Sequence, residues 1–312
     1  MNIRTYRQGD EVKQAAIYNS AAAALPGFKR ATHEDVRRRV KAADFDPATR
    51  FYAEDEGEVV GYATFQQNGR ISFPWCLPGK EAAAGPLLEG VLKAMRGRRL
   101  ARAFAAYRTD WAAVTDFFQA NGFAKVREIL NFVQKMMDLP TMVNRRSLAV
   151  TPFRPADVPA LAAMVPGLIR MPFDQLEAHL LWNPNFAADS LFTLRHPDGA
   201  LRAVGMVIQD RRYADASQLD PQAPCFRLGA FGTEGMTTKR VNGLFSFVTP
   251  AGKEANPVGL DLLWYAATVR LEDSQLEAIA AQVPSDVPHL VEFYQSYFQR
   301  QGGFPIYERS LS

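Results

Sequence analysis

The strongest constraint on the fold is an internal repeat, because the same short patterns occur twice, in the same order, along the 312-residue chain. The segment Ile3–Asp10 (IRTYRQGD) is echoed by Val150–Asp157 (VTPFRPAD), and each is typical of a short strand followed by an aspartate that caps a helix. The segment Asn68–Phe73 (NGRISF) is echoed by Asn242–Phe247 (NGLFSF). Such ordered self-similarity indicates two diverged copies of one module of about 150 residues.

Further paired segments extend the repeat over nearly the whole chain. Both copies contain a hairpin pattern, a Gly-Lys-Glu-Ala loop, an alanine-rich strand and an aromatic helix predicted to end in Gly-Phe. The spacing widens in the second copy, which indicates an insertion between Val207 and Asn242. The matching segments are Phe51–Tyr62 and Leu191–Met206, Gly79–Ala82 and Gly252–Ala255, Ala103–Ala106 and Ala278–Ala281, and Gly122–Phe123 and Gly303–Phe304.

Each copy predicts an α/β (α+β) module in which a mixed, mostly antiparallel sheet is flanked by helices. The order is strand, helical region, hairpin, strand, loop, helix, strand, helix and strand. We place the first domain at residues 1–139 and the second at residues 149–312. The polar, proline-containing stretch 140–148 suits a linker between them.

The composition argues against several classes of protein. With 47% hydrophobic and 22% charged residues, the chain has enough apolar material for two cores. We expect no secretory signal behind Met1 and no membrane span, because no run of about 18 apolar residues occurs. Only Cys76 and Cys225 are available, so no disulfide framework is expected, and a cytoplasmic location is the simple interpretation.

Charge and histidine patterns point away from nucleic acids and metals as partners. The net charge is only +3, and Arg37–Arg39 lack the interleaved aromatic residues of a nucleic-acid site. A solvated helix face is the preferred interpretation of this arginine cluster. The four histidines have the spacing neither of a metal site nor of a catalytic triad, so we expect no metal.

Two loops that precede helices are predicted anion sites. Each loop carries one lysine and ends in a residue expected to cap the helix behind it. The free N–H groups at a helix start and the helix dipole both favour a phosphate at that place. In the first copy these features are loop 78–85, Lys80, Gly85 and helix 87–96; in the second they are loop 250–256, Lys253, Asn256 and helix 258–273.

These segments resemble the GNAT acetyltransferases, in which a loop of pattern Gln/Arg-x-x-Gly-x-Gly/Ala holds the pyrophosphate of acetyl-CoA. Lys80–Gly85 (KEAAAG) approximates this pattern and is followed by the Leu-Leu pair usual in that family. Glu254–Gly259 (EANPVG) matches it less closely. Asp110–Phe123 is similar to the family's fourth helix, Asn-x-x-Ala-x-x-Phe-Tyr-x-x-x-Gly-Phe. The resemblance covers both copies, and so nearly all of the chain.

The resemblance implies two tandem GNAT-like modules that use acetyl-CoA as cosubstrate and no metal. In the family, a backbone N–H near the end of the fourth strand binds the thioester carbonyl, which matches Cys76 and Val248 here. Pro74 suits the splayed strand that admits the pantetheine arm. The implied cofactor-binding residues are Cys76, Leu77, Lys80, Ala83 and Gly85 in the first copy, and Val248, Thr249, Gly252, Lys253 and Asn256 in the second.

The acid that protonates the leaving thiol is, in the family, often a tyrosine of the fourth helix. Phe118 occupies this position in the first copy, so Tyr107 is the candidate there. In the second copy Tyr294 and Tyr297 are the candidates, with core packing as the alternative interpretation of their aromatic helix. No carboxylate stands in the middle of either fourth strand, and Glu234 is the nearest acidic candidate for a general base.

The function implied by the resemblance is acetyl transfer to a primary amine of a small molecule or peptide, by one active copy in a monomer or homodimer. The first copy keeps more of the loop pattern and the second keeps the tyrosine, so both stay candidates for the active one. The alternative is a catalytically inactive tandem protein that binds CoA or another ligand, or acts as a scaffold. Transfer of a longer acyl or an aminoacyl group would use the same fold.

Overall fold

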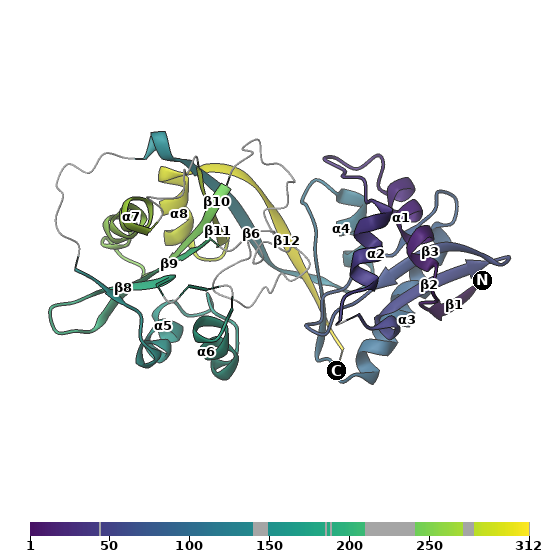
Figure 1. Ribbon diagram of the computed structural model, residues 1–312, viewed down its shortest axis with the longest axis horizontal. Helices are drawn as coiled ribbons and strands as arrows, with labels where there is room; N and C mark the ends of the chain where they lie inside the picture. The colour runs from purple at the N-terminus through teal and green to yellow at the C-terminus, as the bar shows by residue number, and fades with distance from the viewer. Residues whose placement is uncertain are drawn as a thin grey trace. The chain divides into compact units, whose positions relative to one another are not determined.

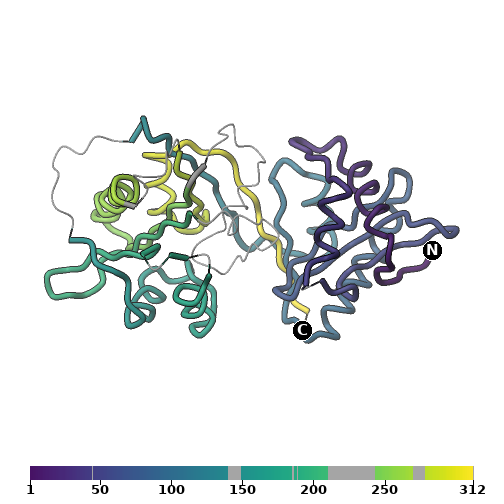
Figure 2. Tube along the Cα trace, in the orientation of Figure 1, coloured from purple at the N-terminus to yellow at the C-terminus, as the bar shows by residue number. Residues whose placement is uncertain are grey.

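The computed structural model describes residues 1–43, 45–139, 149–184, 186–187, 189–209, 241–270 and 278–311. The chain forms two compact units, Met1–Val126 with Phe304–Ser312, and Arg127–Gly303 (Figures 1 and 2). Both units combine strands with helices, which confirms the predicted α/β class. The candidate base Glu234, Cys225 and the predicted linker 140–148 lie outside the described residues.

The first unit is built on an antiparallel sheet of order β1-β2-β3-β4. Helix α3 packs on β2 and β3 through a stripe of buried leucine, valine and methionine side chains spaced as one face of a helix. This packing fixes the start of α3 beside the end of β4. The elements are β1 (Asn2–Thr5), α1 (Asp10–Ala21), α2 (His33–Val40), β2 (Arg50–Asp55), β3 (Glu58–Thr64), β4 (Trp75–Cys76), α3 (Ala84–Gly97), β5 (Arg102–Ala106) and α4 (Ala112–Ala120).

The second unit contains a larger mixed sheet, in which the strands follow the order β12-β6-β11-β10-β9-β8-β7. Gly259 lets α7 approach this sheet, because a Cβ there would lie 2.6 Å from the Phe247 ring. The elements are β6 (Ala124–Lys135), β7 (Val150–Pro152), α5 (Val158–Met164), α6 (Phe173–Leu181), β8 (Leu191–Arg195), β9 (Leu201–Ile208), β10 (Val241–Val248), α7 (Ala255–Tyr265, continued by a π-helix Ala266–Arg270), β11 (Ala278–Pro284), α8 (Pro288–Tyr297) and β12 (Gln299–Ser310).

The last strand of each sequence copy pairs with a strand of the other copy. Strand β6, which ends the first copy, pairs antiparallel with β11. Strand β12, which ends the second copy, pairs antiparallel with β5 through Ile306–Ser310. The repeat cannot reveal this exchange, because either pairing leaves the same pattern in the sequence. The copy boundaries 1–139 and 149–312 therefore stay a prediction, and the compact units differ from the copies by their last strands.

Several predicted helix bounds are wrong. Helix α3 begins at Ala84 rather than residue 87, and α7 begins at Ala255 rather than residue 258. Each helix gains a turn that begins with alanine, a strong helix former, and has its proline in the first turn, where a missing N–H costs no intrahelical bond. The pair Gly303–Phe304 lies inside β12, because α8 already ends at Tyr297.

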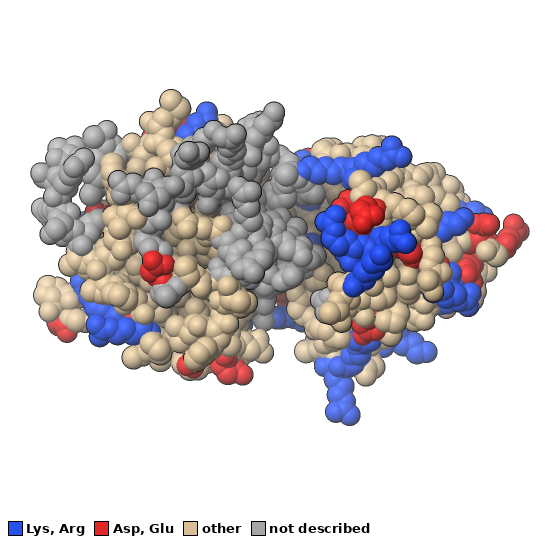
Figure 3. Space-filling view, in the orientation of Figure 1, with Lys and Arg blue, Asp and Glu red and all other residues tan. Residues whose placement is uncertain are grey.

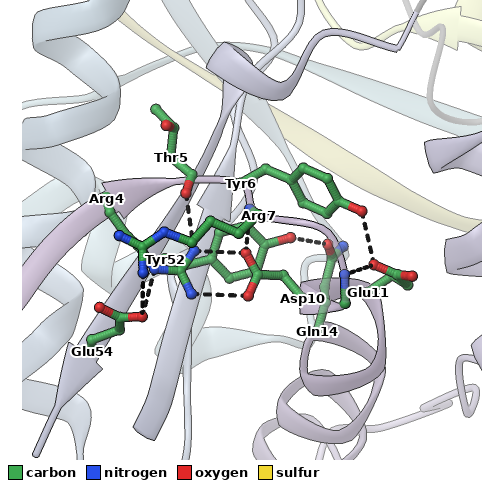
Figure 4. Close-up of polar contacts among 10 residues, drawn as sticks. Arg4, Thr5, Tyr6, Arg7, Asp10, Glu11, Gln14, Tyr52 and Glu54 are labelled. Atoms are coloured by element: carbon green, nitrogen blue, oxygen red, sulfur yellow. Dashed lines mark hydrogen bonds and ion pairs between the residues drawn. The ribbon is translucent and has the colours of Figure 1, made fainter. Parts of the chain in front are cut away.

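The first motif of the repeat forms a polar corner in each unit. In the first unit the Asp10 carboxylate accepts hydrogen bonds from both terminal nitrogens of Arg4, at 2.6 and 2.9 Å, and from the Arg7 N–H at 2.6 Å (Figure 4). Arg4 also reaches Glu54 on β2 at 2.5 Å. The corner thus ties β1, β2 and the start of α1 together.

The second unit keeps this corner with a different arginine. Asp157 accepts from the Arg154 N–H at 2.8 Å and from Arg195 of β8 at 2.7 Å. Neither Asp10 nor Asp157 caps its α-helix through a side-chain hydrogen bond, so the predicted side-chain cap is wrong, although Asp157 is the residue at the N-cap position of α5. The carboxylates instead serve an arginine and an N–H three residues earlier.

Replacing Asp157 with asparagine should lower the free energy of unfolding at neutral pH by about 1–3 kcal/mol, since it removes a partly buried charge-assisted bond. Burial by itself raises the pKa of Asp157, but Arg195 and the Arg154 N–H bring it below the ordinary 3.8. A carboxyl with a lowered folded-state pKa stabilises the protein above its ordinary pKa and loses that effect as the pH falls. In urea titrations, the difference from the wild type should therefore shrink below about pH 4.

Candidate active site

In the first unit the fourth strand pairs with β5 only briefly. The Ile71 N–H donates to the Phe104 carbonyl at 2.9 Å, and the Phe104 N–H donates to Gly69 at 2.8 Å. After this bridge the chain pairs with β3 instead, where Cys76 lies opposite Gly61. The two strands therefore diverge at residues 72–73, next to the proline that predicted the splay; we call this place the divergence point of the first unit.

A tyrosine hydroxyl lies at this divergence point. Tyr107, which directly follows β5, accepts a hydrogen bond from the Phe73 N–H at 2.6 Å. The Tyr107 ring stacks on Phe118 of α4 and on Trp111, with centroid distances of 5.9 and 6.0 Å. The structure thus brings the candidate Tyr107 to the fourth strand. Phe118, which has no hydroxyl, packs against the Tyr107 ring.

The second unit repeats the divergence between β10 and β11. These strands pair in parallel as far as Phe245 and Ala281, after which β10 continues against β9 alone. Tyr294 of α8 packs here: its ring stacks on Phe132 and lies 5.8 Å from that of Phe247. The Tyr294 side chain is buried, and its hydroxyl makes no hydrogen bond of normal geometry to the residues described.

Two groups of β10 act on the Tyr294 hydroxyl. Burial raises the pKa of Tyr294, while the Ser246 hydroxyl and the Phe247 N–H lower it by less. Both groups therefore lie near the hydroxyl. Phe247 is the counterpart of Phe73 in the repeat. Each unit thus directs a tyrosine hydroxyl to the same backbone position, from the end of a strand in the first unit and from a helix in the second.

Tyr297, the other candidate on α8, has a different environment. It is half-buried, and its ring packs on Phe293 at a centroid distance of 5.0 Å. No contact among the described residues connects its hydroxyl with Ser246 or Phe247. The geometry therefore favours Tyr294 over Tyr297 as the tyrosine of the second divergence point.

The loop before α3 satisfies its own polar groups. The Lys80 ammonium forms an ion pair with Asp55, at the end of β2, at 2.7 Å. The Glu81 carboxylate accepts from the Gly79 N–H at 2.9 Å, and this bond and its own N–H lower the pKa of Glu81. The Ala83 N–H donates to the Lys80 carbonyl at 3.0 Å. Carboxylates therefore lie where a phosphate was predicted, and Gly85 lies inside α3 rather than capping it.

The loop before α7 leaves its lysine available. Lys253 is exposed and has no hydrogen bond or ion pair within the described part of the chain. Glu254 is held by Arg202 of β9 at 2.6 Å, and α7 begins at the next residue. Asn256 therefore lies in the first turn of α7, so its predicted capping role is wrong. Gly252 has φ +152°, which the loop needs just before the helix.

The remaining cofactor candidates fall into two groups. The Leu77 N–H donates to Val60 at 2.9 Å, and burial together with Glu81 raises the pKa of the Cys76 thiol to about 12. These two residues serve the sheet edge of the first unit. Val248 ends β10, and the buried Thr249 hydroxyl donates to the Arg202 carbonyl at 3.2 Å. Val248 and Thr249 therefore follow directly on the second divergence point.

Two buried amides of the second unit were missed by the sequence reasoning. Gln282 of β11 and Asn131 of β6 lie opposite each other, and the Gln282 amide donates to Asn131 at 2.9 Å. The sequence does contain a signal for Gln282: it is a single amide residue directly after the apolar segment Ala278–Ala281, whereas buried strands are normally apolar throughout. Asn131 gave none, since its strand belongs to the other sequence copy.

The arginine cluster of the first unit lies on an exposed helix face. Arg37, Arg38 and Arg39 are exposed on α2, and Arg38 lies 3.9 Å from Asp35. Basic side chains on the visible face of the first unit are interspersed with acidic ones (Figure 3). Within the described ranges, no group of histidine, cysteine, aspartate and glutamate could hold a metal ion. No helix of the described chain is long and apolar enough to cross a membrane.

A module in which a strand diverges from its parallel neighbour and leads through a short loop into a helix, present twice in one chain, defines the tandem GNAT fold. No family model and no curated protein matches the sequence. Among solved structures, a GCN5-related N-acetyltransferase from Sphaerobacter thermophilus is similar over 99% of this chain and 95% of its own, with TM-score 0.61 and 13% identity.

Two further structures agree with this assignment. A tandem GNAT protein from the clavulanic acid biosynthesis pathway is similar over 100% of this chain and 98% of its own, with TM-score 0.54 and 11% identity. A GCN5-related N-acetyltransferase from Anabaena variabilis is similar over 100% of this chain and 73% of its own, with TM-score 0.50 and 10% identity. The chain has the tandem GNAT fold, as its repeat and loop motifs predicted.

Proposed function

We propose that this protein is a cytoplasmic N-acyltransferase that moves an acetyl group from acetyl-CoA to a primary amine, and that its second unit carries the reaction. The observation that carries the proposal is the buried Tyr294 hydroxyl at the point where β10 and β11 diverge, which makes no hydrogen bond of normal geometry to the described residues. An unpartnered buried hydroxyl costs free energy, so its retention favours a ligand that completes the bond.

Tyr294 suits the role of the acid in this reaction. Acetyl-CoA, when bound, supplies a thioester whose C–S bond breaks as the amine nitrogen bonds to the acetyl carbon. Tyr294 gives its proton to the departing sulfur and regains one from solvent, while the amine loses one proton to water. The raised pKa of Tyr294 keeps that proton in place at neutral pH. The backbone N–H groups of Val248 and Thr249, which follow directly on the second divergence point, are the proposed donors to the thioester carbonyl.

The two loops favour the second unit for the phosphates of acetyl-CoA. The start of α7 offers N–H groups and the positive end of the helix dipole, with the unpaired Lys253 beside it. Each loop carries a glutamate, but Glu254 is paired with Arg202 and leaves Lys253 available, whereas in the first unit Lys80 is paired with Asp55 and Glu81 accepts from the loop's own Gly79 N–H. We therefore propose that the first unit acts as a scaffold.

Thiol release tests the proposal. The intact protein is incubated with acetyl-CoA and a panel of aliphatic, aromatic and peptide primary amines, and free CoA thiol is measured. Calorimetry with acetyl-CoA measures binding separately. The expected result is binding together with amine-dependent thiol release. If no acetyl-CoA binds, the proposal is overturned; binding without release by any amine would favour the alternative of a ligand-binding or scaffold protein.

Charge reversal of the two loop lysines should have unequal effects. Lys253→Glu is expected to weaken acetyl-CoA binding about 10- to 100-fold, because it replaces a charge-assisted phosphate contact with repulsion. Lys80→Glu, the matched change in the first unit, should leave the dissociation constant unchanged, since Lys80 is already paired with Asp55. Calorimetry on both variants checks this, and equal losses would contradict our placement of the phosphates.

A further inference from the structure

The buried amide pair of the second unit has an oxygen that the fold does not satisfy. Gln282 is 2% exposed and Asn131 is 7% exposed. The Gln282 Nε2 donates to the Asn131 Oδ1, but the Gln282 Oε1 is buried without a hydrogen-bond partner within the described part of the chain. Native proteins rarely leave a buried polar atom in this condition unless a ligand or a function accounts for it.

Strand register places Gln282 at the second divergence point. Ala281 is the last residue of β11 that pairs with β10, so Gln282 is the first one beyond the pairing. Leu244 and Ala280 lie opposite each other, and side chains two residues further along a strand return to the same face. Ser246 and Gln282 therefore face the same side of the sheet, across the place where the strands separate.

Tyr294 reaches this place from the opposite face. Its ring packs on Phe132, which lies opposite Ala281 and so one position away from Asn131 and Gln282. Strands β6, β11 and β10 lie in this order in the sheet, with α8 packed on them (Figure 1). Two buried side chains that each carry an unsatisfied polar atom, one on each face of the sheet, thus lie at the same divergence point.

We infer that the Gln282 Oε1 accepts a hydrogen bond from the N–H of the acceptor amine, and that Asn131 fixes the orientation of Gln282. This inference rests on the proposed function and names the substrate class. The buried polar residues described around the divergence point are neutral: Asn131, Ser246, Thr249, Gln282 and Tyr294. Because none of these buried side chains is a carboxylate, we take the acceptor to be a monoamine bound in its neutral form, rather than a polyamine held by carboxylates. Asn131 comes from the exchanged strand, so the second sequence copy alone lacks part of the site.

The test uses the intact protein with phenethylamine as monoamine probe and spermidine as polyamine probe. Gln282→Met keeps the side-chain length and removes the amide oxygen and nitrogen. It should raise the KM for phenethylamine about tenfold, the worth of one hydrogen bond, and leave the dissociation constant of acetyl-CoA unchanged. Asn131→Leu removes the hydrogen bond that orients the Gln282 amide, so it should raise the KM for phenethylamine by a smaller factor. This variant tests the inference if Gln282→Met does not fold. Wild-type protein should prefer phenethylamine.

Gln134→Met is the matched control, because Gln134 is also buried on β6 but its amide donates to the Lys135 carbonyl at 3.0 Å. Gln134→Met should change the thermal midpoint without changing the KM for phenethylamine or for spermidine. An unchanged phenethylamine KM in both Gln282→Met and Asn131→Leu overturns the inference. If Gln282→Met weakens acetyl-CoA binding and leaves the phenethylamine KM unchanged, the inference is also overturned, because Gln282 then contacts the pantetheine arm. A preference of the wild-type protein for spermidine overturns it as well. If the wild type releases no thiol with any amine, the proposed function fails, and this inference with it.

Discussion

Tyr294→Phe is expected to lower kcat for thiol release by about 100- to 1,000-fold, the usual worth of a positioned general acid. The change removes one oxygen that is buried without a partner in the described structure, and the rest of the ring keeps its packing on Phe132 and Phe247. Acetyl-CoA affinity should stay the same, and the thermal midpoint should stay or rise. Steady-state kinetics, calorimetry and thermal unfolding of the same sample separate these effects.

Tyr107→Phe makes the identical chemical change in the first unit and is the matched control. Its hydroxyl accepts from the Phe73 N–H at 2.6 Å, so its removal should lower stability slightly while leaving kcat near the wild-type value. A large loss of kcat in Tyr107→Phe with none in Tyr294→Phe would show that the first unit is the active one.

The pH profile offers an independent check on Tyr294. Because burial raises its pKa above the ordinary 10.0, the hydroxyl stays protonated as the pH rises through the neutral and mildly alkaline range. A general acid must be protonated to act, so we expect no alkaline decline of kcat below about pH 10. A decline near neutral pH that Tyr294→Phe abolishes would contradict this assignment.

The fold followed from the sequence where the signal was local and repeated. Two copies of NG-x-x-SF before a Gly-Lys-Glu-Ala loop predicted the fourth strand and the loop–helix start in each copy, and the tandem fold has both. Helix starts were misplaced because Gly85 and Asn256 look like caps, whereas the alanines before them extend the helices. Strand exchange left no sequence signal, because pairing partners are chosen in three dimensions.

The candidate site was only partly visible in the sequence for a related reason. Tyr107 and Tyr294 could be singled out by their place before or on the fourth helix, and the structure brings both to a divergence point. The pairing of Lys80 with Asp55, 25 residues away, could not be anticipated from the loop alone. Likewise, Gln282 and Asn131 are separated by 151 residues, so only the folded sheet shows that they form a pair.

Arg127→Met is expected to lower the free energy of unfolding of the intact protein by about 3 kcal/mol, because it breaks a buried charged network. Arg127 lies on β6, the strand that the first copy contributes to the second unit, and its side chain is 1% exposed. Its guanidinium bonds to Asp286 at 3.0 Å and to the carbonyls of Gly167 and Leu168. Removing it leaves those carbonyls without their donor at the position where the exchanged strand enters the unit.

Arg300→Met is the control, because this half-exposed arginine lies 3.9 Å from Glu128 and such a surface pair is worth less than about 1 kcal/mol. Urea unfolding compares the two variants. Hydrogen exchange should show early loss of protection in β6 for Arg127→Met alone. Since Asn131 lies on the same strand and four residues further along it, that variant should also raise the KM for phenethylamine. Equal stability of both variants would contradict the role of Arg127 in holding β6 in the second unit. An unchanged phenethylamine KM in Arg127→Met would show that the position of Asn131 does not depend on Arg127.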